Sequence, residues 1–341
     1  MKKESVFTTR RDFLKYAGLS AGTLAMNSLM PPPALFAKGR YPGDRITFIV
    51  PYSAGGGYDV FARMISPYLS KYIRAVASAA KGGNIVIRNE PGAAGRKGRS
   101  LIMHAKPDGN TLGITDTSVI TDNIVGESDI DLSQFTFLQL AASTTKVIVG
   151  TPKGFDSWSD VVNATKREPV KMAVGPFGRA NHVSAIILNE KMVNKFKLIN
   201  FPGTAQCVSA LIRGDVHMVI ASEESVYGLV EAKEAKVLMV LTAVSKYPGA
   251  ISIKDFGFPE LADQMSSHRF IIAPPALENE PKNILLAALK KATTDREFLE
   301  LTKKNQVPVR NDIFGSDATK MFMEYKKFYE NIAPMLKTHL A

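Results

Sequence analysis

The chain of 341 residues is basic, with a formal net charge of +11 at pH 7, and it contains a single cysteine, Cys207. One cysteine excludes an intramolecular disulfide and any CxxC metal or redox motif. The positive charge favours anionic partners, but the basic residues are scattered and form no aromatic platform with the single Trp and ten Tyr. We therefore expect no nucleic-acid binding. The five histidines lie far apart without metal-ligand spacing, so we expect neither a metal site nor a cofactor.

The first 37 residues have the pattern of an export signal. Two lysines precede Thr9-Arg10-Arg11-Asp12-Phe13-Leu14-Lys15, which leads into an apolar stretch at 16–30. The arginine pair followed by Phe-Leu-Lys is similar to the twin-arginine signal; a merely basic Sec signal is the alternative. The apolar stretch is shorter than the roughly 20 residues that a membrane span needs. We expect cleavage after Ala37 and a mature chain that is not embedded in the membrane.

The mature chain opens with strands, glycine-containing loops and helices in alternation. Apolar runs at 46–50, 85–88 and 111–115 predict strands, and a helical apolar period separates the first two. Pro67 lies inside that first helix, and we expect it to bend the helix. The βαβ order predicts a parallel sheet that binds ligands at the carboxyl ends of its strands.

The rest of the chain continues in the same way. Strands are expected at 146–149, 171–174, 197–200, 217–220 and 237–242, and helices in the tail at 284–292, 295–304 and 317–336. Ser157 and Asp160 have the spacing of a capping box at a helix start. The mature length is too great for one small core, so we expect two lobes.

Two glycine-rich loops each stand between a predicted strand and a predicted helix. They contain Gly55-Gly56-Gly57 and Gly92-Ala93-Ala94-Gly95. Backbone N–H groups at a helix start suit an anion, and two such starts at one sheet edge form a converging set of donors. The alternative is that the glycines serve turn geometry alone. Neither loop has the GxGxxG or Walker pattern of a nucleotide site.

These loops and further blocks together carry a family resemblance. The blocks are Pro51-Tyr52-Ser53-Ala54-Gly55-Gly56-Gly57-Tyr58-Asp59, Asn89-Glu90-Pro91-Gly92-Ala93-Ala94-Gly95, Pro107-Asp108-Gly109-Asn110-Thr111-Leu112, and the segments 181–183, 201–205, 211–216 and 273–275. In order and spacing they resemble the tripartite tricarboxylate transporter receptors, the Bug or TctC-like binding proteins, over nearly the whole mature chain.

The resemblance implies the fold and the function. The fold is the type II periplasmic-binding-protein fold: α/β, with two doubly wound lobes and a ligand cleft between them. Lobe 1 comprises 38–142 and 249–341, and lobe 2 comprises 143–248. The function is capture of a small carboxylate in the periplasm, without catalysis, by a monomer that serves the membrane subunits of a transporter.

The family pattern also implies which residues hold the ligand. These are Ser53, Ala54, Gly55, Gly56, Gly57, Tyr58, Asp59, Ala93 and Ala94 in lobe 1, and Phe177, Gly178, Arg179 and Thr204 in lobe 2. His182 is interpreted as a helix-start histidine rather than a ligand group.

The chain departs from the family pattern in lobe 2 and near the return to lobe 1. Arg179 replaces a small hydroxyl residue, Asn200 replaces a proline, and His268-Arg269-Phe270 occupies a stretch where a tryptophan is usual. The guanidinium of Arg179 fits a carboxylate as a threonine hydroxyl cannot, so we hypothesise a ligand that is a dicarboxylate or an acid with a polar far end. The alternative is that Arg179 points to solvent, as most arginines do.

Two other functions remain as alternatives. A ligand-sensing receptor for a signalling partner would have the same cleft. An enzyme acting on carboxylates is disfavoured, because the sequence has no GxSxG nucleophile elbow and no close pairing of a histidine with an acid.

Overall fold

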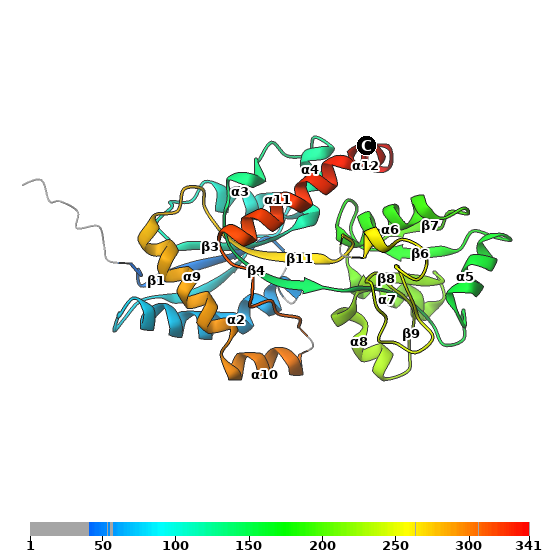
Figure 1. Ribbon diagram of the computed structural model, residues 1–341, viewed down its shortest axis with the longest axis horizontal. Coiled ribbons are helices and arrows are strands. Elements are labelled where there is room, and N and C mark those ends of the chain that lie inside the picture. Colours follow the sequence, from blue (N-terminus) through cyan, green and yellow to red (C-terminus); the bar gives the residue numbers. More distant parts are fainter. Residues whose placement is uncertain (1–40, 53, 55–56, 263, 306, 341) are drawn as a thin grey trace, which may run out of the picture. The chain divides into compact units, whose positions relative to one another are not determined.

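The computed structural model describes residues 41–52, 54, 57–262, 264–305 and 307–340. The predicted export signal lies outside these residues, as do Ser53, Gly55 and Gly56 of the predicted site. The described residues form one compact unit, which contains two β-sheets with helices packed on them (Figure 1). The fold is therefore α/β with two lobes, each built on one sheet.

Lobe 1 is built on a five-stranded sheet with the order β2-β1-β3-β11-β4. Its strands are β1 (Arg45–Val50), β2 (Asn84–Asn89), β3 (Thr111–Asp116), β4 (Thr136–Thr144) and β11 (Ser267–Ala273). β1 pairs in parallel with β2 and β3, as the βαβ pattern predicts. β11 lies antiparallel between β3 and β4, so the strand that returns from lobe 2 completes this sheet.

The helices of lobe 1 cover this sheet with apolar faces. They are α2 (Gly57–Val76), α3 (Arg96–Met103), α4 (Ile120–Ile124), α9 (Asn279–Thr293), α10 (Arg296–Lys304), α11 (Ser316–Asn331) and α12 (Ala333–Leu340). Phe61, Ile65 and Leu69 recur at helical spacing in α2 and pack in one core cluster with Phe48 of β1. The helix runs through Pro67 as one element.

Lobe 2 is built on a six-stranded sheet with the order β10-β9-β5-β8-β6-β7. Its strands are β5 (Lys146–Gly150), β6 (Lys171–Val174), β7 (Lys197–Asn200), β8 (Met218–Ser222), β9 (Lys236–Val240) and β10 (Ile251–Ser252). Its helices are α5 (Trp158–Thr165), α6 (Ala180–Lys191), α7 (Thr204–Arg213) and α8 (Glu223–Glu231). β6, β7 and β8 are parallel, whereas β5 runs antiparallel to both of its neighbours.

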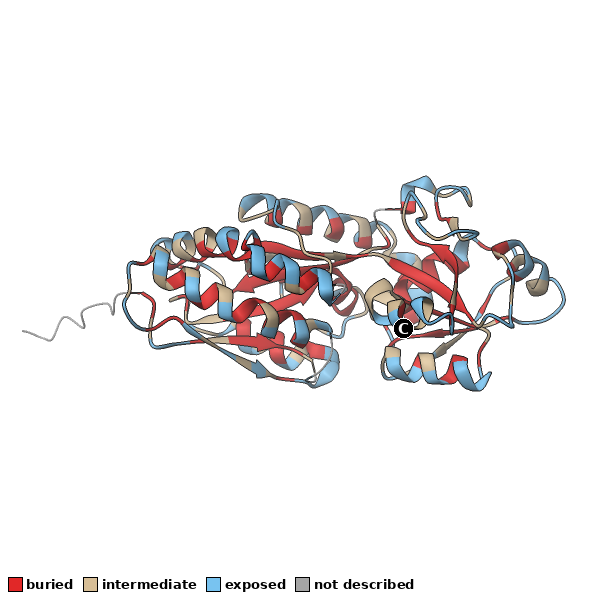
Figure 2. Ribbon diagram, turned by 90° about the horizontal axis from the view of Figure 1, so that it is seen from below, coloured by how far each residue is buried: buried red, intermediate tan, exposed pale blue. Residues whose placement is uncertain are grey.

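Short 3-10 helices occupy several turns, at Ala93–Gly95, Thr117–Val119, Leu132–Gln134 and Pro259–Leu261. Burial is concentrated along the strands, while the outward faces of the helices are exposed (Figure 2). No helix in the described part of the chain has the length and apolar character that a membrane crossing requires.

Most of the predicted elements are present, and Ser157 caps α5 as predicted, since its side chain accepts a hydrogen bond from the Asp160 backbone N–H at 3.3 Å. The Asp160 carboxylate accepts from the Ser157 hydroxyl at 2.8 Å. Three strands, β4, β10 and β11, were not predicted. The expected single helix at 317–336 is divided at Ile332 into α11 and α12. The chain passes from the first sheet to the second after Thr144 and rejoins the first at Ser267; Ile251–Ser252 still belongs to the second sheet.

Candidate functional site

A polar pocket of about 240 Å³ lies where strand ends and helix starts of both lobes face each other. We call it the cleft pocket. Its lining residues are Tyr52, Gly57, Tyr58, Asp116, Ser118, Gly175, Pro176, Arg179, Ala180, Asn181, Thr204, Ser222, Ser225, Ser267 and Arg269. β1 and β3 in lobe 1, and β6 and β8 in lobe 2, all end at this pocket, as expected for ligand sites of open α/β sheets.

The lobe 1 wall of the cleft pocket is organised around Asp116, the last residue of β3. Its side chain is buried and accepts hydrogen bonds from the hydroxyls of Tyr52 at 3.0 Å and Tyr58 at 2.8 Å. The Ser118 backbone N–H donates to the other carboxyl oxygen at 2.7 Å, and so does the Ser118 hydroxyl. The two tyrosine rings lie against each other, with centroids 4.6 Å apart.

The charge state of this cluster follows from its hydrogen bonds. Burial acts to raise the pKa of Asp116, but hydrogen bonds from Ser118 and Tyr58 and the charge of Arg179 act more strongly, and the pKa lies below its usual value. Burial and the charge of Asp116 raise the pKa of Tyr52 and that of Tyr58. The aspartate is therefore ionised and both phenols keep their protons.

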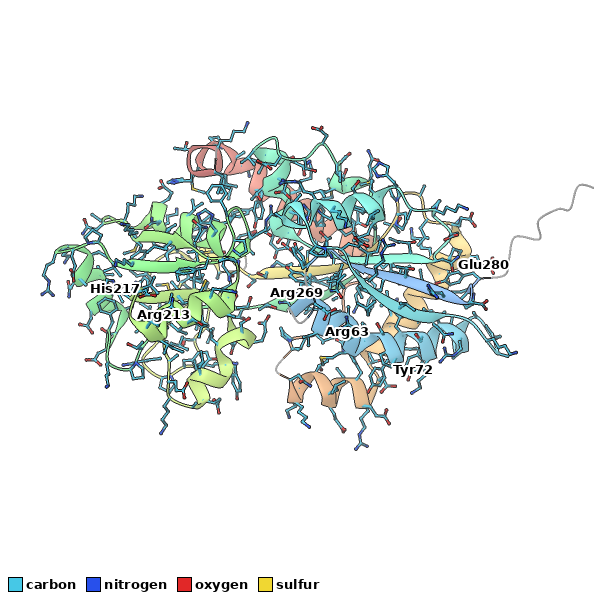
Figure 3. All side chains as sticks on the ribbon, turned by 180° about the vertical axis from the view of Figure 1, so that it is seen from behind. Arg63, Tyr72, Arg213, His217, Arg269 and Glu280 are labelled. Carbon is cyan, nitrogen blue, oxygen red and sulfur yellow. The ribbon has the colours of Figure 1, made fainter. Side chains whose placement is uncertain are left out.

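Arg269, labelled in Figure 3, is on the strand that returns to lobe 1. It lies beside this cluster, since it pairs with Asp116 across β11 and β3. Its Nη2 donates to Glu224 of lobe 2 at 2.7 Å, and its guanidinium lies over the ring of Tyr58, 4.9 Å from the centroid. The buried Nε has no hydrogen-bond partner among the described residues. Gly57 leaves room for this arrangement, because a Cβ there would lie 3.3 Å from Nη2.

Arg179, at the start of α6, links the two lobes. Its Nη2 pairs with the buried Asp122 of α4, which also pairs with the buried Arg99 of α3. Thr121 adds a second link, since its hydroxyl donates to the Gly178 carbonyl at 2.9 Å. The buried Nε and Nη1 of Arg179 donate to no residue that the structure describes. Because Asp122 also pairs with Arg99 and lies 3.7 Å from Arg96, it balances the Arg179 charge only in part, and Arg179 keeps unpartnered donor atoms.

Arg179 and Asp122 also line a second cavity of about 180 Å³, which we call the side pocket. It is lined by Ala94, Arg96, Thr121, Asp122, Val125, Glu127, Phe177, Gly178, Arg179 and Leu340. The predicted site residues are therefore divided. Gly57, Tyr58, Arg179 and Thr204 line the cleft pocket, whereas Ala94, Phe177 and Gly178 line the side pocket together with Arg179.

Three predicted residues line neither pocket. Ala54 and Ala93 are exposed, and the buried carboxylate of Asp59 accepts hydrogen bonds from Arg63 at 2.9 Å and Asn89 at 3.0 Å. In the structure, the Asp59 side chain therefore joins α2 to the end of β2.

The second glycine loop packs tightly on the first. Ala93 and Ala94 both adopt left-handed backbone conformations, with φ of 45° and 53°. A Cβ on Gly95 would lie 3.2 Å from the Pro51 carbonyl oxygen, and one on Gly98 would lie 2.7 Å from the Pro51 Cα. These glycines are needed for close packing of the two loops.

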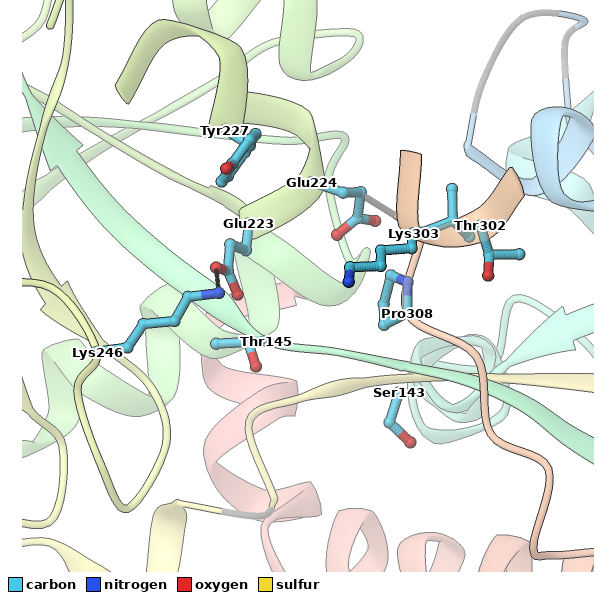
Figure 4. Close-up of a pocket in the computed structure, with 10 residues that line it drawn as sticks. Ser143, Thr145, Glu223, Glu224, Tyr227, Lys246, Thr302, Lys303 and Pro308 are labelled. Carbon is cyan, nitrogen blue, oxygen red and sulfur yellow. Dashed lines mark ion pairs between the residues drawn. The ribbon is translucent and has the colours of Figure 1, made fainter. Parts of the chain in front are cut away.

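A third cavity of about 200 Å³, the hinge pocket, lies beside the strands that cross between the lobes (Figure 4). Its lining residues include Ser143, Thr145, Glu223, Glu224, Lys246 and Lys303. Lys246 pairs with Glu223 at 2.5 Å, and Glu224 reaches from this pocket to Arg269. The hinge pocket thus carries charges of both signs.

Two further buried groups fix the start of α6. The Lys146 ammonium donates to the Ala180 carbonyl at 2.9 Å and to the Ser184 hydroxyl at 2.6 Å. Burial lowers its pKa to about 7, against the opposing charge of Asp116. His182 accepts a hydrogen bond from the Gly178 N–H at 3.0 Å, and burial lowers its pKa to about 4, so it is a neutral helix-start histidine as interpreted.

Sequence reasoning missed Asp116 and Arg269 as pocket residues. Asp116 follows a predicted strand directly, and that position at a carboxyl sheet edge was an available signal. Arg269 lies in the stretch noted as a departure from the family pattern. The acidic partners of the two arginines, Asp122 and Glu224, had no signal in the sequence.

Two sheets, two strand connections between them and a polar pocket lined by both lobes are the features of a two-lobed solute-binding protein. The sequence model of the tripartite tricarboxylate transporter family receptor, TctC, matches residues 71–326, and the chain belongs to this family.

Individual relatives are distant. The chain is 25% identical over 311 residues to the "UPF0065 protein in tcbD-tcbE intergenic region" of Pseudomonas sp., covering 84% of this chain and 88% of that one. MatC of Rhodopseudomonas palustris with bound malate is similar in fold, with TM-score 0.71, 18% identity and coverage of 86% and 100%. A second R. palustris protein, with adipate, gives TM-score 0.70, 20% identity and coverage of 87% and 98%.

Proposed function

We propose that this chain is a periplasmic solute-binding protein that captures a small carboxylate in the cleft pocket and presents it to the membrane subunits of a tripartite tricarboxylate-type transporter. The observation that carries the proposal is the set of buried, unpartnered donor atoms of Arg179 and Arg269 beside a pocket lined by both lobes. Unpartnered buried donors are costly, and a carboxylate offers the acceptors that they lack. Malate and adipate in the two R. palustris proteins agree with this class of ligand.

The narrower part of the proposal is a dicarboxylate. Arg179 stands in lobe 2 with Nε and Nη1 unpartnered among the described residues, and Arg269 stands on the returning strand. One acid group at each guanidinium would bridge the lobes. Glu224 balances the charge of Arg269, whereas Asp122 is shared by Arg96, Arg99 and Arg179, so recognition at Arg179 would rest on charge as well as on hydrogen-bond geometry.

The remaining predicted site residues are part of the same proposal. The first glycine loop, 53–59, would hold one end of the ligand with Gly57 and Tyr58, and Thr204 would contact the other end. Ala94, Phe177 and Gly178 would join the site only if the Arg179–Asp122 pair separates and connects the side pocket to the cleft pocket.

Native mass spectrometry of the protein purified from its own periplasm tests the proposal. The expected result is a co-purified acid of low mass that is lost on unfolding. Recovery from the periplasm with a bound cation, sugar or nucleotide instead would contradict the ligand class, and recovery only from the cytoplasm would contradict the location.

A further inference from the structure

Three hydroxyl groups line one wall of the cleft pocket and share a single acceptor. The phenols of Tyr52 and Tyr58 donate to one oxygen of Asp116, at 3.0 and 2.8 Å, and the Ser118 hydroxyl donates to the other. The Ser118 backbone N–H, at 2.7 Å, brings the number of donors to the carboxylate to four. An ionised carboxylate has about four lone-pair sites, so Asp116 is saturated by this protein alone.

The saturated aspartate fixes the direction of all three hydroxyls. A hydroxyl has one proton to donate and two lone pairs that accept. Because each proton already points to Asp116, the three oxygens can offer only lone pairs to the pocket. The low pKa of Asp116 and the raised pKa of Tyr52 and Tyr58 keep these protons where they are.

Next to these hydroxyls the same pocket carries groups of the opposite character, since Arg269 of β11 pairs directly with Asp116 of β3 in the sheet. Arg269 and Arg179 line the pocket as cations, and their unpartnered nitrogen atoms can only donate. The Arg269 guanidinium lies 4.9 Å from the centre of the Tyr58 ring whose hydroxyl is an acceptor. One small molecule can therefore contact the donor groups of the arginines and the acceptor oxygens of the hydroxyls at once.

We propose that the cleft pocket selects carboxylates that also carry a hydrogen-bond donor, a hydroxyl or an ammonium group, within a few bonds of the acid. The acid faces the arginines, and the donor faces the oxygens of Tyr52, Tyr58 and Ser118. This inference rests on the proposed function, because it names the class of ligand for the same pocket. A ligand without such a donor buries acceptor lone pairs without a partner, which weakens its binding.

Matched ligands that differ by one group test the inference. Calorimetry on the mature wild-type protein compares L-malate and L-aspartate with succinate. At least one donor-bearing ligand is expected to bind about tenfold more tightly than succinate or better, which is the usual effect of leaving a buried polar group unpaired. Equal affinities, or tighter binding of succinate, would overturn the inference and leave the proposed carboxylate function intact. No binding of any carboxylate, including adipate and citrate, would overturn the proposed function and this inference with it.

Variants assign the preference to the hydroxyl cluster. Tyr58→Phe is expected to bring the malate-to-succinate affinity ratio at least threefold closer to one. Asp116→Asn frees a tyrosine proton for the ligand, because the amide group donates where the carboxylate accepted, and it is expected to reduce the ratio further. Tyr72→Phe is the control, since the Tyr72 hydroxyl donates to Asp295 at 2.8 Å outside the pocket, and its ratio should equal that of the wild type. An unchanged ratio in a folded Tyr58→Phe protein would contradict the assignment, whether or not Asp116→Asn folds.

Discussion

Replacement of Asp122 by asparagine removes the acidic partner that three arginines share: Arg96, Arg99 and Arg179. The Asp122 side chain is 3% exposed, that of Arg99 is 1% exposed and that of Arg179 is 12% exposed. Asparagine has the same shape but no charge, so the substitution leaves Arg99 buried without an anionic partner. Arg179 can reach water if the lobes separate, whereas Arg99 lies within lobe 1 and cannot.

The expected cost follows from this burial. Removing one partner of a buried ion pair lowers the free energy of unfolding by about 3–5 kcal/mol. For Asp122→Asn we expect a loss of about 3 kcal/mol, at the lower end of this range, because the Arg179 guanidinium can become solvated. Glu127→Gln is the matched control: Glu127 pairs with Arg96 at 2.8 Å but is 54% exposed, and such a pair contributes about 0–1 kcal/mol.

Urea unfolding followed by circular dichroism measures both variants against the wild type. The account predicts a large fall in the midpoint for Asp122→Asn at an unchanged slope, and little change for Glu127→Gln. A loss below about 1 kcal/mol for Asp122→Asn, or equal losses for the two variants, would refute the reasoning that Asp122 neutralises buried arginines.

Four further predictions concern the same region. Arg179→Ala should weaken the binding of the diacid adipate by about 1.5–3 kcal/mol in calorimetry and leave the affinity for its monoacid analogue hexanoate unchanged. Equal losses for both ligands would show that Arg179 does not bind the second acid group. Burial lowers the pKa of Lys146 from 10.5 to about 7, so the unfolded chain binds more protons between these values. The free energy of unfolding should therefore rise with pH there, by up to about 1.4 kcal/mol per pH unit, and Lys146→Met should lack this contribution in urea melts at pH 7 to 9. Gly57→Ala should displace the Arg269 guanidinium and lower carboxylate affinity at unchanged thermal stability, and wild-type affinity would count against this role. Ala94→Gly should raise the free energy of unfolding by up to about 1 kcal/mol by relieving a left-handed alanine, and a loss in urea unfolding would contradict that strain.

The strands that the sequence predicts correctly are those with local signals. β1 and β3 are apolar runs that end where turns or loops begin, and local pattern alone places them. β4 was missed because its buried run includes Gln139, whose amide donates to the Arg310 carbonyl at 2.7 Å. A hydrogen bond to a residue far along the chain makes the burial of this glutamine possible. A local sequence pattern does not show such a long-range partner.

The antiparallel directions of β5 and β11 were also beyond local reasoning, since they follow from the two chain passages between the lobes. For the site, the sequence indicated Arg179 and strand ends that line the cleft pocket. It could not indicate that Asp122, 57 residues away, pairs with Arg179, or that Glu224, 45 residues away, pairs with Arg269. Long-range charge pairing therefore decides which predicted residues are available to a ligand.

The central claim is that a small carboxylate binds in the cleft pocket against Arg269 and Arg179. A crystal structure of the mature protein with the acid that co-purifies from the periplasm tests this claim most directly. The account predicts a ligand carboxylate oxygen within about 3 Å of a guanidinium nitrogen of Arg269 or Arg179, in contact with both lobes. A carboxylate bound in the hinge pocket or on the surface, with Nε and Nη1 of Arg179 and Nε of Arg269 still unpartnered, would contradict it.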